Sequence, residues 1–392
     1  MRGESLEILS GDITGAFSGI VSDTGEDGRV GSVGRREALE ALAEKLSMDV
    51  LSMKGEEQSP VWHAEGDVWE HSMRVVESLL DSGGEGRLRE LCLDVLAGLL
   101  HDVAKPAVGV VEDGVRRHPG HAKVGARMSR EILWRAGLCW EAKERICRRI
   151  LWHLHPFFLF EKDAVERERI LLAAGAGEGV GGLARLARAD VRGRECGDKD
   201  EMLFKVDLFE ELAGDLGVME APYGFADDHS QAEYFANPGR WRDFGAHDSS
   251  VGEVIILSGL PGAGKSSWVK KNWDGSVISL DEIRRRRGVD ASNQARVAGI
   301  AREEMREFLR QKKSFVYDST ALTRDRRAKI ISLGRDYGFR VRVMAFELGY
   351  NEWVRRDGTR EAGVGEDVLS HMLGRWEFPS VEEGIELAVV SG

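Results

Sequence analysis

The chain has 392 residues, enough for two or three domains that each bury a core. No apolar run approaches membrane-spanning length, and the first ten residues lack the basic and apolar segments of a secretion signal. We therefore expect a soluble, cytoplasmic protein with no membrane partner. The net charge of −12 divides into −15 for residues 1–250 and +3 for residues 251–392, so acidic polymers are not excluded as ligands of the C-terminal part. The four cysteines form no C-x-x-C pair, which predicts reduced thiols.

Residues 1–34 show little periodicity and predict no element. A helix is expected over residues 36–53, because Leu39, Leu42, Leu46 and Val50 share one face. Helical periodicity then runs from residue 63 to about residue 216 without strand-like alternation, so this region is predicted to be all-α. We assign residues 1–57 to an N-terminal extension and residues 58–222 to a helical domain.

Histidines concentrate in this helical region, which holds seven of the chain's ten. His101 and Asp102 are adjacent at the end of an apolar-periodic helix, and such a pair by itself is often only a helix cap or a surface feature. His71 and Asp190 also lie in apolar-periodic helices, where an ionisable side chain needs a partner. Imidazole and carboxylate groups are ligands for divalent transition metals, so these four residues are candidates for a metal site.

The order of these residues, His71, His101-Asp102 and Asp190, resembles the signature of the HD phosphohydrolase superfamily, an all-helical, metal-dependent fold. The segments 62–67, 101–106, 120–126 and 152–156 are further similar to the HD domain of bacterial CCA-adding enzymes, a likeness that covers residues from about 58 to 196. The nucleotidyltransferase domain of those enzymes has no counterpart here, so their tRNA-tailing activity is not carried over.

The resemblance implies a role for each residue of the motif. The signature residues would hold a first metal, and Lys105 would bind a substrate phosphate. His121 and His153 are candidates for a second metal. A His and Asp set suits manganese, cobalt, nickel, zinc or iron, and such a metal activates water to hydrolyse phosphoesters. Three more histidines remain open between substrate-facing and surface roles: His63, His118 and His155.

Composition changes over residues 223–250, where aromatic residues mix with Gly, Pro and Asp without a period. We assign this stretch to an inter-domain connection. A β-branched apolar run then precedes residues 259–266, which fit G-x-x-x-x-G-K-[ST]. In this motif backbone N–H groups cradle phosphates, Lys265 reaches the β- and γ-phosphates, and the Ser266 hydroxyl holds Mg²⁺. The expected cofactors are ATP, or another nucleoside triphosphate, and Mg²⁺. The residues expected to bind the nucleotide here are Gly259, Gly262, Ala263, Gly264, Lys265, Ser266 and Ser267.

Alternating helices and strands follow, with strands expected at 276–280, 315–317 and 340–346 and helices at 268–272, 293–310 and 324–333. This pattern predicts an α/β domain with a parallel sheet over residues 251–392. The overall prediction is therefore a multi-domain protein, an all-α HD-domain fold followed by an α/β P-loop kinase domain. Ligands of such sheets bind beyond the carboxyl ends of the strands.

Polar residues stand at those strand ends, with Asp281 and Arg284 after the second strand and Asp318 after the third. With the phosphate loop and an arginine-bearing lid, this set resembles the polynucleotide 5′-kinase family over roughly residues 253–375. The resemblance implies that Asp281 is the general base for a 5′-hydroxyl and that Arg284 grips the adjacent phosphate. Asp318 would order the acceptor side or the magnesium shell. The alternative for Asp281 is a helix N-cap.

The family's lid uses one or two arginines to stabilise charge on ATP, and this sequence offers several. We choose Arg355 and Arg360 for this role and keep Arg356 in reserve. Arg285, Arg286 and Arg287 are expected to form a solvated basic face that also touches phosphates.

An HD phosphoesterase fused to a polynucleotide kinase resembles a bacterial architecture that removes 2′,3′-cyclic, 2′- or 3′-phosphates and phosphorylates 5′-hydroxyls. The leading hypothesis is such a bifunctional end-healing enzyme. Its partners would be nucleic-acid ends, DNA or RNA, and a ligase acting on the healed ends is a further candidate. One alternative is a small-molecule P-loop kinase fused to an HD nucleotidase, and another is a nucleotide-gated regulatory protein with a vestigial HD site.

Overall fold

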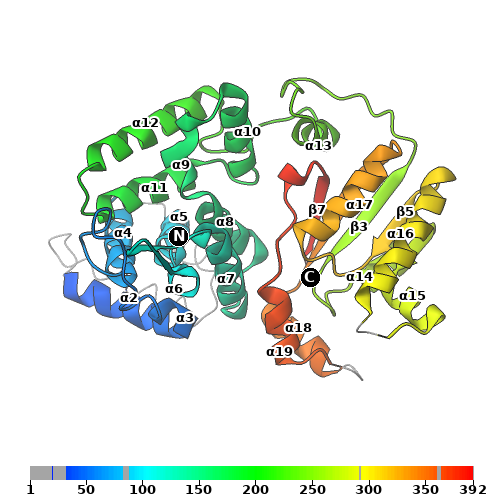
Figure 1. Cartoon of the computed structure of the whole chain (residues 1–392), viewed down its shortest axis with the longest axis horizontal. Coiled ribbons are helices and arrows are strands. Elements are labelled where there is room, and N and C mark those ends of the chain that lie inside the picture. The colour runs from blue at the N-terminus through cyan, green and yellow to red at the C-terminus, as the bar shows by residue number, and fades with distance from the viewer. Residues whose placement is uncertain (1–19, 21–31, 83–87, 291–292, 360–362, 392) are drawn as a thin grey trace. The chain divides into compact units, whose positions relative to one another are not determined.

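The computed structural model describes residues 20, 32–82, 88–290, 293–359 and 363–391. These residues form two compact units, Met1–Tyr223 and Gly224–Gly392, whose elements are labelled in Figure 1. No helix in these described ranges combines the length and the apolar character needed to cross a bilayer. The first unit is mainly helical and the second is an α/β unit, which confirms the predicted fold class.

The N-terminal unit is built mainly from helices. Its α-helices are α2 (Ser32–Leu46), α3 (Met48–Leu51), α4 (Val68–Ser82), α5 (Leu88–Leu100), α6 (Lys105–Val108), α7 (His121–Arg135), α8 (Trp140–Trp152), α9 (His155–Phe158), α10 (Ala164–Ala174), α11 (Gly181–Gly193) and α12 (Lys199–Asp215), and a 3-10 turn, η1, spans Leu159–Glu161. The predicted helix over residues 36–53 is thus two helices, with Ser47 capping the second by accepting a hydrogen bond from Asp49 N at 3.1 Å.

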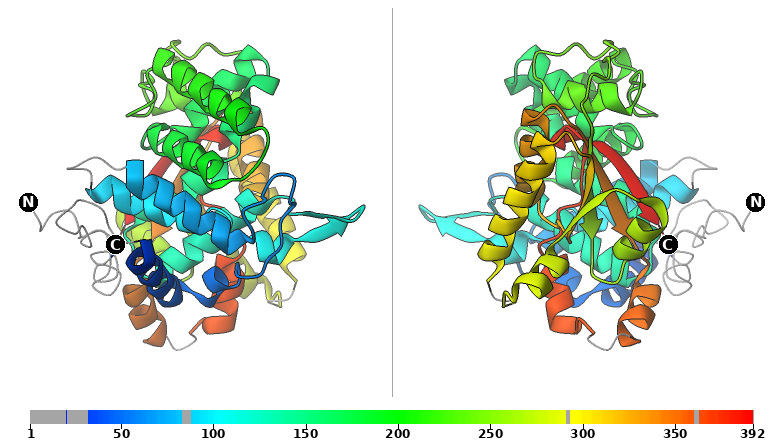
Figure 2. Two further views of the ribbon diagram at one scale, coloured as in Figure 1. Left: turned by 90° about the vertical axis from the view of Figure 1, so that its left-hand side faces the viewer. Right: turned by 90° about the vertical axis from the view of Figure 1, so that its right-hand side faces the viewer.

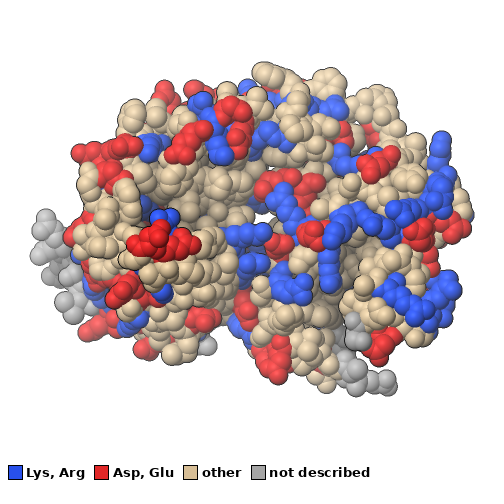
Figure 3. Space-filling model, viewed as in Figure 1, with Lys and Arg blue, Asp and Glu red and all other residues tan. Residues whose placement is uncertain are grey.

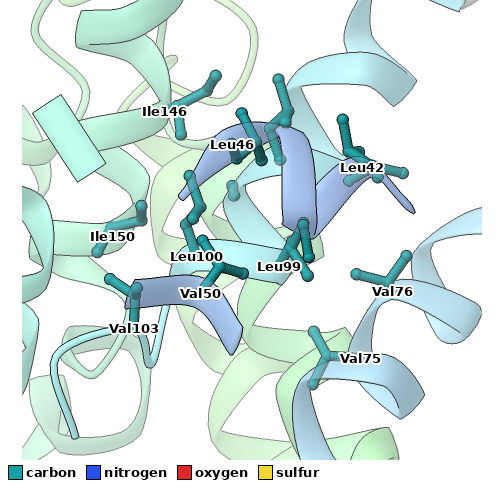
Figure 4. Packing of buried hydrophobic residues seen from close by; sticks show 14 of the residues in the cluster. Leu42, Leu46, Val50, Val75, Val76, Leu99, Leu100, Val103, Ile146 and Ile150 are labelled. Carbon is teal, nitrogen blue, oxygen red and sulfur yellow. The ribbon is translucent and has the colours of Figure 1, made fainter. Parts of the chain in front are cut away.

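One hydrophobic core joins α2, α3, α4, α5, α7, α8 and α11, and a second, smaller cluster joins α9, α11 and α12. Helix α4 packs against α5 and α11, and α5 packs against α8. Figure 4 shows Leu42 and Val50 meeting the apolar faces of the other helices, including Val76, Leu99 and Ile146. All five are fully buried, so α2 and α3 belong to the same core as α4, α5 and α8.

A buried ion network also ties α5, α8 and α11 to one another. Nη1 of Arg149 on α8 lies 2.7 Å from Oδ1 of Asp94 on α5, and Nε of Arg185 on α11 lies 2.7 Å from Oδ2 of the same carboxylate. Glu178 accepts a further hydrogen bond from Arg149 at 2.8 Å. Because an unpaired buried charge is costly, these contacts restrict how the three helices can shift.

A short hairpin interrupts the helices, which the sequence analysis did not expect. Strand β1 (Val110–Glu112) pairs antiparallel with β2 (Val115–Arg117) through a turn in which Asp113 and Gly114 both have positive φ, 53° and 75°. An Asp-Gly pair favours such a two-residue turn, but strands of three residues are too short to show alternation. In Figure 2 the hairpin extends away from the helices as a cyan arm.

The C-terminal unit alternates strands and helices. Its strands are β3 (Glu253–Gly259), β4 (Ser276–Ser279), β5 (Phe315–Asp318), β6 (Arg340–Glu347) and β7 (Glu386–Ser391), and its helices are α13 (Asp228–Ala236), α14 (Lys265–Asn272), α15 (Leu280–Arg287), α16 (Gln294–Arg310), α17 (Arg324–Asp336), α18 (Tyr350–Gly358), α19 (Glu366–Leu373) and the 3-10 turn η2 (Val381–Glu383). Helix α13 lies in the stretch assigned to a connection, and it packs against β7 and η2.

All five strands are parallel, in the order β4-β5-β3-β6-β7. The central strand β3 is buried along most of its length, as its continuous run of β-branched and leucine residues predicts. Strand β7 was not expected from the sequence. The carboxyl ends of β3, β4 and β5 lie along one edge, where the phosphate loop, the start of α15 and Asp318 come together.

Candidate metal and nucleotide sites

The six histidine and aspartate residues predicted as metal ligands lie together inside the N-terminal unit. They form two groups in which the ligand atoms all lie within 4.8 Å of one another, and the members are His71, His101 and Asp190 in one group and Asp102, His121 and His153 in the other. All of these side chains are buried except that of His121, which is partly exposed. Residues up to 119 positions apart in the sequence are thus brought to one place by the packing of α4, α5, α7, α8 and α11.

The helices themselves fix which nitrogen of three imidazoles faces the centre. Nδ1 of His101, His121 and His153 lies 2.8, 2.9 and 2.7 Å, respectively, from the carbonyl oxygen three residues earlier. A carbonyl only accepts, so Nδ1 donates and Nε2 of the neutral ring keeps its lone pair. Hydrogen bonds of this kind orient an imidazole for a metal and keep the correct tautomer.

His71 is oriented by a carboxylate. Its Nδ1 lies 2.8 Å from Oε1 of Glu65, and the same oxygen lies 2.8 Å from Nδ1 of His63. Oε2 of Glu65 accepts a hydrogen bond from the backbone N–H of Glu195 at 2.8 Å. Burial opposes charge on Glu65, but its hydrogen bonds to the two histidines and to this N–H outweigh burial and lower the pKa of the carboxyl. Glu65 is therefore an ionised group behind His71.

Asp190 is oriented by an arginine one helical turn later. Nε and Nη2 of Arg194 donate to Oδ1 and Oδ2 of Asp190 at 2.9 and 2.7 Å. His71 Nε2 lies 3.1 Å from the same Oδ1. Burial raises the pKa of Asp190, but the Arg194 charge and the contact with His71 lower it well below its ordinary value overall. The carboxylate is therefore ionised and held in one orientation.

Several buried atoms at the centre have polar neighbours but no well-formed hydrogen bond. His71 Nε2, His101 Nε2 and Asp102 Oδ2 make no hydrogen bond of good geometry to any residue that the structure describes. His101 Nε2 and Asp102 Oδ2 are 3.2 Å apart, and His71 Nε2 is 3.9 Å from that oxygen. Atoms that each lie about 2.0–2.2 Å from one ion are within about 4.4 Å of each other, so these donors fit a divalent metal. An unsatisfied set of this kind is otherwise costly to bury.

Lys105 adds a positively charged side chain next to the ligand atoms of this group. Lys105 Nζ lies 2.6 Å from Asp102 Oδ2 and donates to Oε1 of Gln58 at 2.6 Å. Burial opposes charge on Asp102, but His101 and Lys105 outweigh it and hold the pKa of that carboxyl well below its usual range. Burial also lowers the pKa of His153 to about 3, which keeps this imidazole neutral and able to bind a metal.

In the C-terminal unit, the phosphate loop has the backbone that its glycines permit. Gly262 and Gly264 have φ of 83° and 97°, and a Cβ on Gly259 would lie 2.6 Å from the carbonyl oxygen of Phe346. Residues with a side chain rarely adopt these conformations. The loop lines a cleft of about 890 Å³ together with Ser267 and the start of α15. This volume suits a nucleotide.

The two polar residues that follow the loop glycines contact the loop backbone and the end of β5. Lys265 Nζ donates to the carbonyl oxygens of Gly259 and Leu260 at 2.9 and 2.8 Å. Ser266 Oγ donates to Asp318 Oδ2 at 3.2 Å, which joins the loop to the end of β5. Burial raises the pKa of Asp318 despite the nearby Lys265 charge. A hydroxyl and a carboxylate in contact are oxygen ligands of the type that Mg²⁺ prefers.

Asp281 and Arg284 line the same cleft. Asp281 forms an ion pair with Arg284 through Nη1, and Arg284 Nη2 donates to Oε1 of Gln294 at 2.9 Å. The helix N-cap at this point is Ser279, whose Oγ accepts from the backbone N–H of Glu282. The alternative that Asp281 caps the helix is therefore wrong, and its side chain is 90% exposed.

Both units match known families. Residues 68–174 match the family described as HD domain, and residues 254–379 match the family described as AAA domain. The chain joins an HD phosphohydrolase domain to a P-loop kinase-like domain. A stretch of 122 residues, 29% of the chain, is 31% identical to a protein named multifunctional CCA protein from Halorhodospira halophila (strain DSM 244 / SL1). The match spans only 26% of that protein's length.

The predicted lid arginines lie only partly at the phosphate cleft. Arg355 does not line the cleft, since it is 68% exposed and paired with Glu352 at 2.6 Å. Arg356 lies on the adjacent face of α18, with Nη1 3.8 Å from the position that a Cβ on Gly264 would take. Successive residues of a helix point about 100° apart, so only one of the two faces the loop. Arg360 lies outside the described residues.

Four residues of the two candidate sites were not predicted from the sequence. In the HD domain, Arg194 and Glu65 orient two ligands, and the spacing of four between Asp190 and Arg194 on a helix is a pattern that could have identified the first. In the P-loop domain, Arg326 and Arg375 line the cleft. Arg326 stands just beyond the carboxyl end of β5, where ligands of a parallel sheet gather.

Proposed function

We propose that the chain heals nucleic-acid ends, by phosphorylating 5′-hydroxyls with ATP and by removing 2′,3′-cyclic, 2′- or 3′-phosphates. Nucleic-acid ends of DNA or RNA are its proposed partners, with a ligase acting downstream. The observation that carries the kinase half is Arg284, which lines the phosphate cleft beside Asp281. An arginine there can hold the phosphate that neighbours an accepting hydroxyl, a group that a small alcohol lacks.

In the kinase reaction, the 5′-oxygen attacks the γ-phosphorus of ATP and the bond to the β–γ bridging oxygen breaks. The Asp281 carboxylate takes the hydroxyl proton, and ADP leaves. Lys265 exchanges its bonds to the two loop carbonyls for phosphate oxygens, and the Ser266 and Asp318 oxygens would hold Mg²⁺. Arg356 and Arg326 then stabilise the charge that develops on the transferred group.

In the phosphatase reaction, a first water attacks the phosphorus of a cyclic phosphate and one ribose ester bond breaks, which leaves a 2′- or 3′-phosphate. A second water attacks the phosphorus of this monoester, the remaining bond to the ribose oxygen breaks, that oxygen takes a proton, and inorganic phosphate leaves. His71, His101, Asp102 and Asp190 would hold a divalent metal, which would supply activation of the water and neutralisation of phosphoryl charge. Lys105 binds a phosphoryl oxygen beside Asp102. His118 lies three residues before His121, and its Nε2 is hydrogen-bonded to Glu56 at 2.9 Å. It adds a further polar side chain next to the proposed metal ligands.

One substrate tests both halves. An oligonucleotide with a 5′-hydroxyl and a 2′,3′-cyclic phosphate is incubated with ATP, Mg²⁺ and Mn²⁺, and its products are separated by electrophoresis and mass spectrometry. We expect a 5′-phosphate and a 3′ end without phosphate. Phosphorylation of free nucleosides as efficient as that of oligonucleotides would favour a small-molecule kinase and overturn the kinase half.

A further inference from the structure

Gln58 is a polar side chain buried in a stretch of chain that is otherwise exposed or half-buried. Its relative exposure is 8%, and it is the single buried residue of the stretch 54–64, all of which the structure describes. A glutamine side chain carries two N–H donors and one acceptor oxygen, so its burial is costly unless these groups are paired. The mechanism proposed above assigns this side chain no role.

The amide oxygen of Gln58 is paired with a residue of the HD site. Oε1 accepts a hydrogen bond from Lys105 Nζ at 2.6 Å, and the same ammonium group lies 2.6 Å from Asp102 Oδ2. An ammonium group only donates, so the oxygen of the amide faces it and the amide nitrogen points away from it. The contact therefore fixes the orientation of the amide as well as the position of the lysine.

The amide nitrogen of Gln58, Nε2, is buried and has no hydrogen-bond partner among the residues that the structure describes. Buried donors in proteins are almost always satisfied, so we expect an acceptor from outside the chain at this position. Nε2 belongs to the amide that holds Lys105, and its acceptor therefore lies beside the ammonium group that is proposed to bind phosphate. A phosphoryl oxygen is an acceptor that suits both groups.

The chain on either side of Gln58 is held in place by its own contacts. Oε1 of Glu56 lies 2.9 Å from Nε2 of His118, which is part of the polar surroundings of the site. The carbonyl oxygen of Ser59 accepts a hydrogen bond from the backbone N–H of His63 at 2.9 Å. These contacts restrict the backbone at residue 58, so the amide is positioned before a substrate arrives.

The outer surface of the N-terminal unit offers little general attraction to a polyanion. Figure 3 shows acidic and basic side chains intermixed over the visible face of this unit. The first 250 residues, which include this unit, carry a net charge of −15. Phosphate recognition in this unit therefore depends on donors close to the metal ligands. A neutral amide supplies such a donor without changing the charge of the site.

We propose that Gln58 and Lys105 form a phosphate clamp in the HD site, in which Gln58 Nε2 donates to a phosphoryl oxygen and Oε1 holds the ammonium group toward the same phosphate. This inference rests on the phosphatase half of the proposed function. Because the amide is neutral, its hydrogen bond is available to a singly charged cyclic phosphate and to a doubly charged monoester alike. One clamp can thus serve both steps of phosphate removal.

A double-mutant cycle on phosphate binding tests this inference. Gln58→Met removes both hydrogen-bonding groups at nearly constant volume, and Lys105→Met removes the ammonium group. The dissociation constant of inorganic phosphate is measured by calorimetry in the presence of Mn²⁺. All proteins in the cycle carry Lys265→Ala, which weakens phosphate binding at the P-loop. Loss of a hydrogen bond to a charged acceptor should lower the phosphate affinity of Gln58→Met by about 10- to 150-fold.

The cycle separates direct binding from positioning. If Nε2 contacts the phosphate, Gln58→Met should weaken phosphate binding by about 10-fold or more even in the Lys105→Met background. If Gln58 only held Lys105, its replacement would have no effect once the lysine is absent, and the proposed contact with phosphate would be wrong.

The controls separate the clamp from the fold and from the metal. Gln311, exposed at the end of α16 in the other unit, provides the matched variant Gln311→Met, which should keep the wild-type affinity for phosphate. Manganese content, measured by elemental analysis, should be unchanged in Gln58→Met, and loss of manganese would overturn the role of Gln58 as a phosphate donor. If Gln58→Met misfolds by circular dichroism, Gln58→Leu takes its place as a second apolar side chain of similar size.

The outcomes also distinguish this inference from the proposed function. If the wild-type protein removes terminal phosphates and Gln58→Met keeps both its turnover and its affinity for phosphate, the inference is wrong and the proposed function stands. If the wild-type protein removes phosphate from no oligonucleotide, the phosphatase half of the proposed function is overturned. Binding of inorganic phosphate that still depended on Gln58 would then support the clamp alone.

Discussion

His121 and His153 face each other through Nε2, and these two nitrogens are 3.3 Å apart. Each ring already donates its Nδ1 proton to the carbonyl oxygen three residues earlier. In the neutral state both Nε2 atoms therefore present lone pairs to one another, which is unfavourable unless a cation lies between or beside them. Asp102 Oδ1, 3.4 Å from His121 Nε2, supplies the third donor. This geometry supports the proposal of a second metal position.

Metal binding should stabilise the folded protein through these residues. We expect Mn²⁺ to raise the melting temperature of the wild-type protein, because a ligand at about 100 times its Kd adds about 2.7 kcal/mol to the free energy of unfolding. His153→Ala should reduce the number of bound metal ions, measured by elemental analysis, and shrink the thermal shift. His247→Ala is the matched control, since His247 is exposed in the other unit. Full metal content in His153→Ala would argue against its role as a ligand.

The metal-free protein should lose stability as the pH falls below about 6.5. Burial lowers the pKa of His153 to about 3 and that of His63 to about 4, whereas both titrate near 6.5 in the unfolded chain. At pH values between the folded and the unfolded pKa, the unfolded state binds more protons than the folded state. The stabilisation from these neutral histidines is therefore complete above the unfolded pKa, and it is lost as the pH falls toward the folded pKa. The raised pKa of His101 has the opposite effect on stability. It is one histidine, however, whereas several histidines, His121 among them, have a lowered pKa.

Urea unfolding in the presence of a chelator, followed by tryptophan fluorescence, measures this effect. The free energy of unfolding of the HD unit should be lower at about pH 5.5 than at about pH 7.5, because His153 and His63 gain protons over that interval in the unfolded chain and not in the folded protein. Added metal should stabilise the HD unit more at the higher pH than at the lower and so increase the difference, since protons compete for the ligands. Equal stability at the two pH values would contradict the assignment of neutral, buried histidines.

The two activities should be separable by mutation. Each set of predicted residues lies within one unit, with Asp102 in the first and Lys265 in the second. Asp102→Ala should abolish phosphate removal and leave kinase activity nearly unchanged, and Lys265→Ala should do the reverse. Both activities are measured on the same doubly modified oligonucleotide. Loss of both from either change, in a protein that still shows cooperative unfolding, would instead indicate a composite site.

The sequence predicted those parts of the structure that depend on local pattern. The phosphate loop, the parallel strands β3 to β6 and the gathering of His71 with Asp190 all followed from motif and periodicity. It did not predict what depends on tertiary contacts. Glu65 contacts His71 only because the chain before α4 brings it next to that helix. Arg326 lines the cleft only because α17 begins shortly after the end of β5. Strand β7 gains its partner only from β6, and its short sequence shows little alternation.

The position of Arg356 gives a further test of the P-loop domain. Both Arg355 and Arg356 pair with Glu352 at 2.6 Å, but only Arg356 also lies near Gly264. Arg356→Gln should lower the kinase kcat, because a charge near the transferred phosphate is lost, and Arg355→Gln should have a small effect. The two variants differ only in which face of α18 is changed. A larger loss for Arg355→Gln would mean that α18 turns when nucleotide binds.

The identity of the general base can be decided between Asp281 and Asp318. Asp281 is exposed in the cleft and does not cap α15, so Asp281→Asn should leave the stability of the protein unchanged. If it accepts the proton of the 5′-hydroxyl, kcat should fall by about 10²- to 10⁴-fold with an unchanged KM for ATP. Asp318 contacts Ser266, so Asp318→Asn should instead shift the dependence of the rate on Mg²⁺ concentration.

A pH profile completes this distinction. Loss of a base that must be ionised removes the acidic limb from the plot of log kcat against pH, whereas loss of a magnesium ligand leaves that limb in place at a higher Mg²⁺ requirement. Ser279→Ala is the control for the helix terminus, because Ser279 holds the cap hydrogen bond. It should reduce stability and spare kcat. If Asp281→Asn kept full turnover and Asp318→Asn lost the acidic limb, Asp318 would be the base and Asp281 would serve only to hold Arg284.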